Sequence, residues 1–206
     1  MLRIITPPPV EPVTVEEAKL HCRVDHNDED ATFERLITAA RVSCESFVGR
    51  AFVERVYEYT LDRFPRGRKI VLPYPPVVSI DSVVYYDRDG ALETMVEGDD
   101  YLVDTINEPA AVILPNGISW PSLSLYALHP IRVTYTAGYP MIPGTPDDYT
   151  TNVPAYAKQA ILLCVGNWYE HREAVLPAGH VGKELPLGIQ SLLWNERSNW
   201  AGERNE

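Results

Sequence analysis

Four residues near the end of an expected first helix have the types and the spacing of metal ligands. His21 and Asp25 are four residues apart, as are Cys22 and His26, so each pair could share one face of a helix. No third and fourth ligand follow at a recognisable spacing, and Asp25 and His26 are expected beyond the end of the helix. We therefore predict no metal site and no cofactor.

The run that begins at Asp25, Asp-His-Asn-Asp-Glu-Asp, has the acidic character of a calcium-binding loop. It lacks glycine at the sixth position, where Asp30 stands, and glutamate at the twelfth, where Leu36 stands. Its carboxylates suit the positive end of the dipole of the next helix, so we interpret the run as a helix-capping turn.

The sequence contains no motif that indicates catalysis. Nucleophile-elbow, phosphate-loop, dinucleotide-binding and His-Glu-x-x-His patterns do not occur in it. His171 stands at the end of an expected helix, where a cation suits the dipole, so its default role is structural. We predict no catalytic residue and no enzymatic activity. Because active-site residues can converge from distant segments, a small cytoplasmic metal-binding enzyme that uses His21, Asp25, His26 or His171 stays as an alternative.

One basic cluster stands out in an acidic chain. The 206 residues include 18 Lys and Arg against 29 Asp and Glu, a net charge of −11, which argues against steady binding of DNA phosphates. The cluster consists of Arg63, Arg66, Arg68 and Lys69, in a loop expected between two strands. Such a loop can contact an acidic partner or passing DNA, or it can simply be solvated.

Two tryptophans, Trp194 and Trp200, lie near the C-terminus, and Leu192 and Leu193 directly precede the first of them. Tryptophan is enriched among interface anchors, but it can equally cover the core of its own domain. Both interpretations stay open at this point.

The three cysteines, Cys22, Cys44 and Cys164, are far apart and fall inside expected helices. This pattern favours small buried residues in a reducing compartment over a disulfide framework.

Helices are predicted at both ends of the chain. Thr14 and Glu17 form a capping-box pattern before a helix over 15–23, and a longer helix with an apolar stripe from Phe33 follows until Gly49. A proline-rich link over 139–154 leads to a strongly apolar helix, and a short helix is expected over 187–197.

Between these helical parts the hydrophobic period changes to two, which is typical of strands, and turn signals separate the segments. The predicted strands span 54–62, 69–72, 77–86, 91–96, 101–104, 111–114 and 130–136.

These elements predict an α+β fold in which a helical bundle of N- and C-terminal helices carries an inserted small antiparallel β unit. We expect residues 1–52 to form the N-terminal helical part, 53–138 the β unit, and 139–206 the link, the C-terminal helices and a tail. The content of 45% hydrophobic and 23% charged residues is that of an ordinary globular chain. No apolar run is long enough for a membrane span, and the N-terminus does not resemble a signal peptide.

Ten short segments of the sequence, taken in their order along the chain, resemble segments of a known protein family. They are PVTVEEAK at 12–19, HCRVD at 21–25, DED at 28–30, VGRA at 48–51, LPYPPV at 72–77, DDYLVD at 99–104, VTYTAGY at 133–139, VP at 153–154, AILL at 160–163 and WYEHREAV at 168–175. In this order they resemble the head-tail connector (adaptor) proteins of tailed phages, prophages and gene transfer agents. The resemblance covers about residues 10–175, and the last ~30 residues match less well.

The resemblance implies a non-enzymatic subunit that assembles with itself as a ring, usually of twelve copies. Such a ring binds beneath the portal protein and extends the DNA channel toward the tail, where it meets a stopper or tail-completion protein. It implies a place at the head-tail interface of a virion or phage-like particle, synthesis in the bacterial cytoplasm and no membrane contact. An acidic lumen would let DNA pass without binding it.

Under this resemblance, two groups of residues are expected to contact partners. Leu192, Leu193, Trp194 and Trp200 would anchor the contact with the portal, and the loop of Arg63, Arg66, Arg68 and Lys69 would contact a neighbour. A stopper or tail-completion protein of the same particle is a further alternative, although a stopper is expected to be mainly β.

Overall fold

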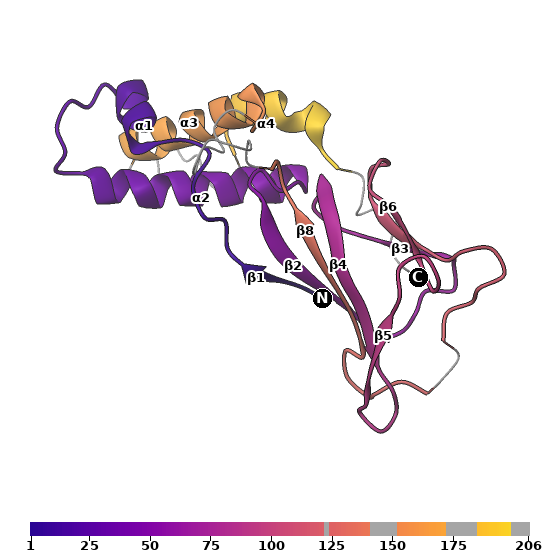
Figure 1. The fold of residues 1–206 in the computed structure, drawn as a ribbon. Coiled ribbons are helices and arrows are strands. Elements are labelled where there is room, and N and C mark those ends of the chain that lie inside the picture. Colours follow the sequence, from indigo (N-terminus) through magenta and orange to yellow (C-terminus); the bar gives the residue numbers. More distant parts are fainter. Residues whose placement is uncertain (122–123, 141–151, 172–184, 199–206) are drawn as a thin grey trace. The chain divides into compact units, whose positions relative to one another are not determined.

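The structure is a computed structural model that describes residues 1–121, 124–140, 152–171 and 185–198 (Figure 1). The described residues form two compact units. A β unit contains Met1–Pro9 and Gly49–Pro140, and a helical unit contains Val10–Val48 together with described residues of Met141–Arg197.

The β unit consists of two antiparallel sheets. The first has five strands in the order β1 (Leu2–Thr6), β2 (Arg55–Leu61), β8 (Ile131–Ala137), β4 (Val77–Tyr86) and β5 (Leu92–Met95). The second has three strands in the order β3 (Lys69–Val71), β7 (Ala111–Ile113) and β6 (Leu102–Asp104). Strand neighbours are far apart in the sequence, since β8 lies between β2 and β4.

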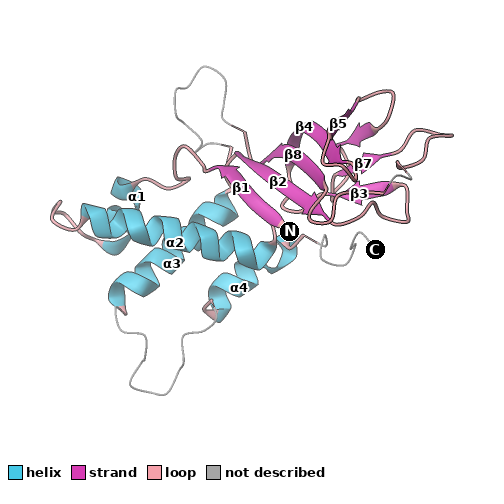
Figure 2. Cartoon of the chain, turned by 90° about the horizontal axis from the view of Figure 1, so that it is seen from below, coloured by secondary structure: helices cyan, strands magenta, loops and turns pink. Residues whose placement is uncertain are grey.

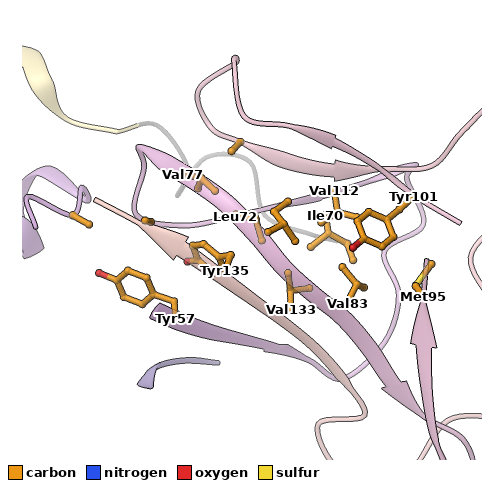
Figure 3. Close-up of a cluster of buried hydrophobic side chains, with 14 residues drawn as sticks. Tyr57, Ile70, Leu72, Val77, Val83, Met95, Tyr101, Val112, Val133 and Tyr135 are labelled. Atoms are coloured by element: carbon orange, nitrogen blue, oxygen red, sulfur yellow. The ribbon is translucent and has the colours of Figure 1, made fainter. Parts of the chain in front are cut away.

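The core of the β unit contains side chains from both sheets (Figure 3). Tyr135 is completely buried, and its ring stacks on that of Tyr57 with 5.5 Å between the centroids. Its hydroxyl donates a hydrogen bond of 2.7 Å to the carbonyl oxygen of Pro73. Burial raises the pKa of Tyr135 well above its usual value, so the phenol remains a neutral donor. The Tyr135 hydroxyl is therefore a buried polar group whose hydrogen bond is made within the core.

Gly138 ends β8 at a point where three backbone segments meet. Its φ is +125°, and a Cβ atom there would lie 2.4 Å from the carbonyl carbon and oxygen of Val53. Its amide donates a hydrogen bond of 2.8 Å to the carbonyl oxygen of Pro76. Only glycine fits this close approach without moving the backbone.

The helical unit contains α1 (Val15–Cys22), α2 (Asp30–Val48), α3 (Ala155–Glu170) and α4 (Leu187–Leu193), and α4 continues into the 3-10 helix η1 (Trp194–Glu196). Helices α1, α3 and α4 all pack against α2 (Figure 2). The predicted capping box is confirmed, because Thr14 and Glu17 bond each other's backbone amides at the start of α1.

A buried ion cluster joins the segment before α1 to α2. Arg41 and Glu45 are each only 4% exposed, and Arg41 Nη1 lies 2.9 Å from Glu45 Oε2. The same guanidinium binds both carboxylate oxygens of Glu11, at 2.6 and 3.1 Å. Burial opposes the charge of Arg41, but the hydrogen bonds and charges of Glu11 and Glu45 outweigh it and hold its pKa above the usual value. The Arg41 guanidinium therefore lies between the carboxylates of Glu11 and Glu45 and binds both.

The predicted α+β class is confirmed, and each predicted helix and strand has a counterpart within a few residues of its predicted bounds. Helices from both ends of the chain share one unit, as expected. Residues 2–6 were not predicted as a strand, yet they form β1 and the first nine residues belong to the β unit. The part of the chain that is described thus has eight strands, one more than the seven predicted, and they form two sheets within the β unit. None of its helices is long and apolar enough to cross a membrane.

Candidate functional site

An exposed aromatic cluster lies at the C-terminal end of the helical unit. We define it as Phe47, Trp194 and Arg197. The Trp194 side chain is 58% exposed, and its ring centroid lies 6.5 Å from that of Phe47. The guanidinium carbon of Arg197 lies 4.9 Å from the Trp194 ring centroid and 5.3 Å from that of Phe47. Such cation–π contacts hold the indole in place while leaving much of it open to solvent.

A groove of about 1000 Å³ continues from this cluster along α2. Its floor is mostly small or apolar, and Val42 within it is 51% exposed. Charged residues stand at one part of its lining, where Glu34 and Arg35 lie. The lining residues are Glu34, Arg35, Thr38, Ala39, Val42, Ser43, Ser46, Phe47, Leu185 and Gln190. An open, largely apolar groove with an aromatic anchor beside it is suited to holding a side chain or helix of another protein.

The other predicted anchors of the C-terminal contact are placed differently. Leu193 is completely buried within its own helical unit, and Leu192 is half-buried. Trp200 lies outside the described residues. Of the four predicted anchors, Trp194 is therefore the one that the described structure presents to solvent, while Leu193 serves the core.

The predicted basic loop of the β unit is held by aromatic packing beneath it. Phe64 stacks on Trp120 with 5.1 Å between ring centroids and 10° between ring planes. The Trp120 indole donates a hydrogen bond of 2.7 Å to the carbonyl oxygen of Gly67. Phe64 also meets the ring of Tyr85 edge-on. The loop therefore has a fixed conformation.

The four basic residues of this loop do not have equal roles. Arg68 donates hydrogen bonds to the carbonyl oxygens of Leu114 and Pro115, at 2.9 and 2.6 Å, so it secures the loop. Lys69 begins β3. Arg63 and Arg66 are exposed and form no ion pair within the described structure. These two cations are the ones available to an acidic partner.

The residues with metal-ligand spacing are not brought together. His21 lies against Gly166, whereas His26 is 3.8 Å from Asp28. Among described residues there is no group of three or more side chains that could hold a metal ion. Burial raises the pKa of the Cys22 thiol, and the negative charge of Glu170 raises it further. A raised pKa disfavours the thiolate, which is the nucleophilic form.

His171 occupies the position that its sequence context predicts. It caps the C-terminus of α3, and its backbone amide donates to the carbonyl oxygen of Asn167 at 3.0 Å. Its ring nitrogen Nδ1 lies 3.0 Å from the same oxygen. A structural role at the helix end accounts for these contacts.

The groove along α2 was missed by the sequence analysis. The groove is lined in part by Leu185 and Gln190, which lie far from α2 in the sequence. No sequence pattern predicts that this C-terminal segment packs beside α2. One signal was present, because Val42 is an apolar residue outside the predicted buried stripe of its helix.

Comparison with known proteins gives a match to one family model and a fold shared with solved structures. Residues 12–84 match the family model described as "Phage gp6-like head-tail connector protein". No curated protein sequence matches the chain. Among solved structures, a chain in a virion of a native gene transfer agent particle is similar, with 21% identity, a TM-score of 0.74, and coverage of 96% of this chain and 95% of that one.

Two further similar chains come from the neck of the same kind of particle. One belongs to the neck of an empty particle computed with C6 symmetry, with 21% identity and a TM-score of 0.73. The other belongs to the neck of a native particle computed with C12 symmetry, with 19% identity and a TM-score of 0.68. Both matches cover 96% of this chain and 95% of the other. At this level of identity the similarity establishes a shared fold.

Proposed function

Because residues 12–84 match the model of the gp6-like head-tail connector family, we propose that this chain is a structural connector (adaptor) subunit of a virion or phage-like particle. In this role it forms a homo-oligomeric ring beneath the portal protein and extends the DNA channel toward the tail. A stopper or tail-completion protein would bind the other side of the ring. The role requires no catalysis.

The observation that carries this proposal is the extent of the shared fold. The similarity to a neck chain covers 96% of this chain, so it includes the helical unit and the β unit together and is not confined to the family-matched segment. The helical unit also favours an adaptor over a stopper, since a stopper is expected to be mainly β. The C12 symmetry stated for one of these necks supports a ring of twelve copies.

The charge of the chain supports a channel through which DNA slides. With a net charge of −11, a ring of this subunit repels phosphates on average and offers few cations to hold them. We propose transient passage of DNA without specific binding, at the head-tail interface of the particle.

The helical unit is proposed as the ring body, and each unit carries one contact surface. The aromatic cluster with its groove would bind the portal, since an exposed, held tryptophan next to an apolar groove has the composition of an interface anchor. The loop containing Arg63 and Arg66 would contact an acidic surface of a neighbouring subunit.

The first test is the mass of the purified chain, measured by light scattering or native electrophoresis alone and after mixing with the portal protein of its own particle. Twelve copies of the 23.2 kDa chain have a mass of about 280 kDa. We expect several copies to assemble on the portal. A chain that stays monomeric with the portal present would refute the connector role.

The same experiment tests the loop. Reversing the exposed charge in Arg66→Glu should weaken self-association about tenfold or more, and the wild-type ring should weaken as salt rises, because the contact is electrostatic. Arg88→Glu, in the exposed turn between β4 and β5, is the matched charge-reversal control. Equal assembly by the two variants would remove the loop from the subunit contact.

For the portal contact, we expect Trp194→Ala to weaken binding to the portal about 10- to 100-fold, as truncation of an aromatic anchor does. Because Trp194 is 58% exposed, the fold should tolerate its loss. Portal binding is measured by surface plasmon resonance or by co-sedimentation. Leu20→Ala, at an 81% exposed position of α1, is the control for loss of an exposed apolar side chain. Unchanged affinity in Trp194→Ala would show that the cluster lies outside the contact.

A further inference from the structure

Two buried thiols face each other inside the helical unit. The Sγ atoms of Cys44, in α2, and Cys164, in α3, are 3.7 Å apart. Both side chains are completely buried, and the two residues are 120 positions apart in the chain. Both are free thiols in this structure. Their burial confirms the sequence prediction for these two cysteines, but their proximity was not predicted.

We propose that Cys44 and Cys164 form a redox-active pair, and that a low-molecular-weight disulfide of the glutathione class converts them to an intramolecular disulfide between α2 and α3. This inference does not depend on the proposed connector function, because it concerns the helical unit of one chain.

The surroundings of the pair favour bond formation. Small side chains, Ala40 on α2 and Ala157 and Ala160 on α3, are completely buried on the same two packed helices. Small residues allow two helix backbones to approach closely, which a disulfide requires. Shortening the sulfur separation from 3.7 Å to a bond of about 2.05 Å is a displacement of under 2 Å, shared between two side chains and two helices.

The chemistry proceeds by two thiol–disulfide exchanges. The thiolate of one cysteine attacks a sulfur of the small disulfide, which gives a mixed disulfide and releases one small thiolate. The second cysteine loses its proton and attacks the protein sulfur of the mixed disulfide, and the second small thiol leaves. In sum, two protein thiols are oxidised to one disulfide, and one small disulfide is reduced to two thiols.

The folded environment makes the reduced pair persistent. The hydrogen bond between the two thiols, together with burial, raises the pKa of Cys44, so the attacking thiolate is scarce. Full burial also excludes the oxidant, so exchange requires opening of the helical unit or takes place during folding. We therefore expect oxidation of the folded protein to be slow and to accelerate as pH rises.

The disulfide would have a topological effect. Cys44 precedes residues 49–140 of the β unit and Cys164 follows them, so the disulfide would form a covalent loop of the chain that contains all of residues 49–140. A peptide bond cut between residues 49 and 140 would then leave the two fragments covalently joined.

The test is to refold the full chain in a buffer of oxidised and reduced glutathione and to compare it with the chain refolded in dithiothreitol. We expect a mass lower by about 2 Da, loss of two of the three titratable thiols and a peptide map that joins Cys44 to Cys164. The melting temperature should rise by roughly 5–15 °C and return on reduction. After limited proteolysis between residues 49 and 140, the oxidised chain should run as one band until it is reduced.

Cys22 supplies the matched control. The variant Cys22→Ser should still lose two thiols and gain the same thermal shift, whereas Cys44→Ala and Cys164→Ala should each show no shift on oxidation. The proposal is overturned if wild-type protein keeps all three thiols after refolding in the oxidising buffer, or if the disulfide that forms includes Cys22. The wild-type measurement decides the matter even if a variant fails to fold.

Discussion

Replacing Arg41 with methionine is expected to destabilise the chain by about 3–5 kcal/mol at neutral pH. Arg41 is 4% exposed, and its guanidinium binds Glu11 through two nitrogens and Glu45 through a third. Methionine fills a similar volume but removes the guanidinium that both carboxylates bind, and Glu45 is buried while Glu11 is half-buried. The loss is measured by urea unfolding, as the change in the free energy of unfolding between wild type and variant.

Acid should reverse much of this effect. Without Arg41, the two charged carboxylates repel each other with no guanidinium between them. Such groups cost stability at neutral pH, and the cost disappears as they become protonated. The gap in free energy of unfolding between wild type and variant should therefore narrow as the pH is lowered from neutral into the acid range in which carboxylates take up protons. A gap that stays constant across this range would show that lost packing, not charge, is responsible.

A double substitution separates the charge from the packing in a second way. In Arg41→Met with Glu45→Met, one of the two carboxylates that bind Arg41 is also removed. We expect the double variant to be more stable than Arg41→Met alone, because replacing both partners of a buried ion pair by apolar groups costs less than removing one. A double variant less stable than the single one would contradict this account.

The second large effect is expected from Gly138→Ala, which should destabilise the β unit by about 3–5 kcal/mol or prevent folding. The new Cβ would lie 2.4 Å from the Val53 carbonyl group and 2.5 Å from the Glu54 nitrogen, and these atoms are backbone and cannot rotate away. The register fixes them further, since Arg55 pairs with Ala137 next to the collision. Thermal unfolding and the yield of soluble protein are the measurements.

Substitutions at two other glycines distinguish the two causes of destabilisation, which are the steric collision of the new Cβ and the strain of a left-handed backbone. Gly98 has a φ of +92° and no atom within 4 Å of an added Cβ, so Gly98→Ala should cost only the strain of a left-handed residue, about 1–2 kcal/mol. Gly67 also has open space, without a left-handed φ, so Gly67→Ala should be nearly neutral. A loss in Gly138→Ala no larger than in Gly98→Ala would show that the β8 end relaxes easily.

Local structure was predictable from the sequence where a periodic pattern and a clear boundary coincide. Strand β4 occupies the predicted residues because Val77 follows a proline pair and Tyr86 precedes a turn signal. Strand β1 was missed because its five residues show no buried alternation, and its burial pattern is almost wholly exposed. The position of β1 in the sheet is set by its backbone pairing with β2, which lies more than fifty residues later in the chain. A local sequence pattern cannot predict pairing over such a distance.

The candidate sites were predictable to a smaller extent. Composition identified the basic loop, but the separate roles of Arg66 and Arg68 depend on contacts with the distant carbonyls of Leu114 and Pro115. The exposure of Trp194 and the full burial of its neighbour Leu193 follow from how α4 packs. The pair of thiols likewise meets only because α2 and α3 pack together across the insertion. Contacts of such sequence separation are set by tertiary packing and are invisible to periodicity.

The position of β1 also bears on how genes for such chains can recombine. The strand is encoded before the helices α1 and α2, whereas its partner β2 is encoded after them. A gene segment that replaced residues 49–140 alone would bring a new β2 to an old β1. Since main-chain hydrogen bonds hold the pair and most β1 side chains are exposed, a foreign β2 could accept the resident strand if it kept the register. This edge strand could thus stay in place with the gene segments that encode the helices while the segment for residues 49–140 is exchanged.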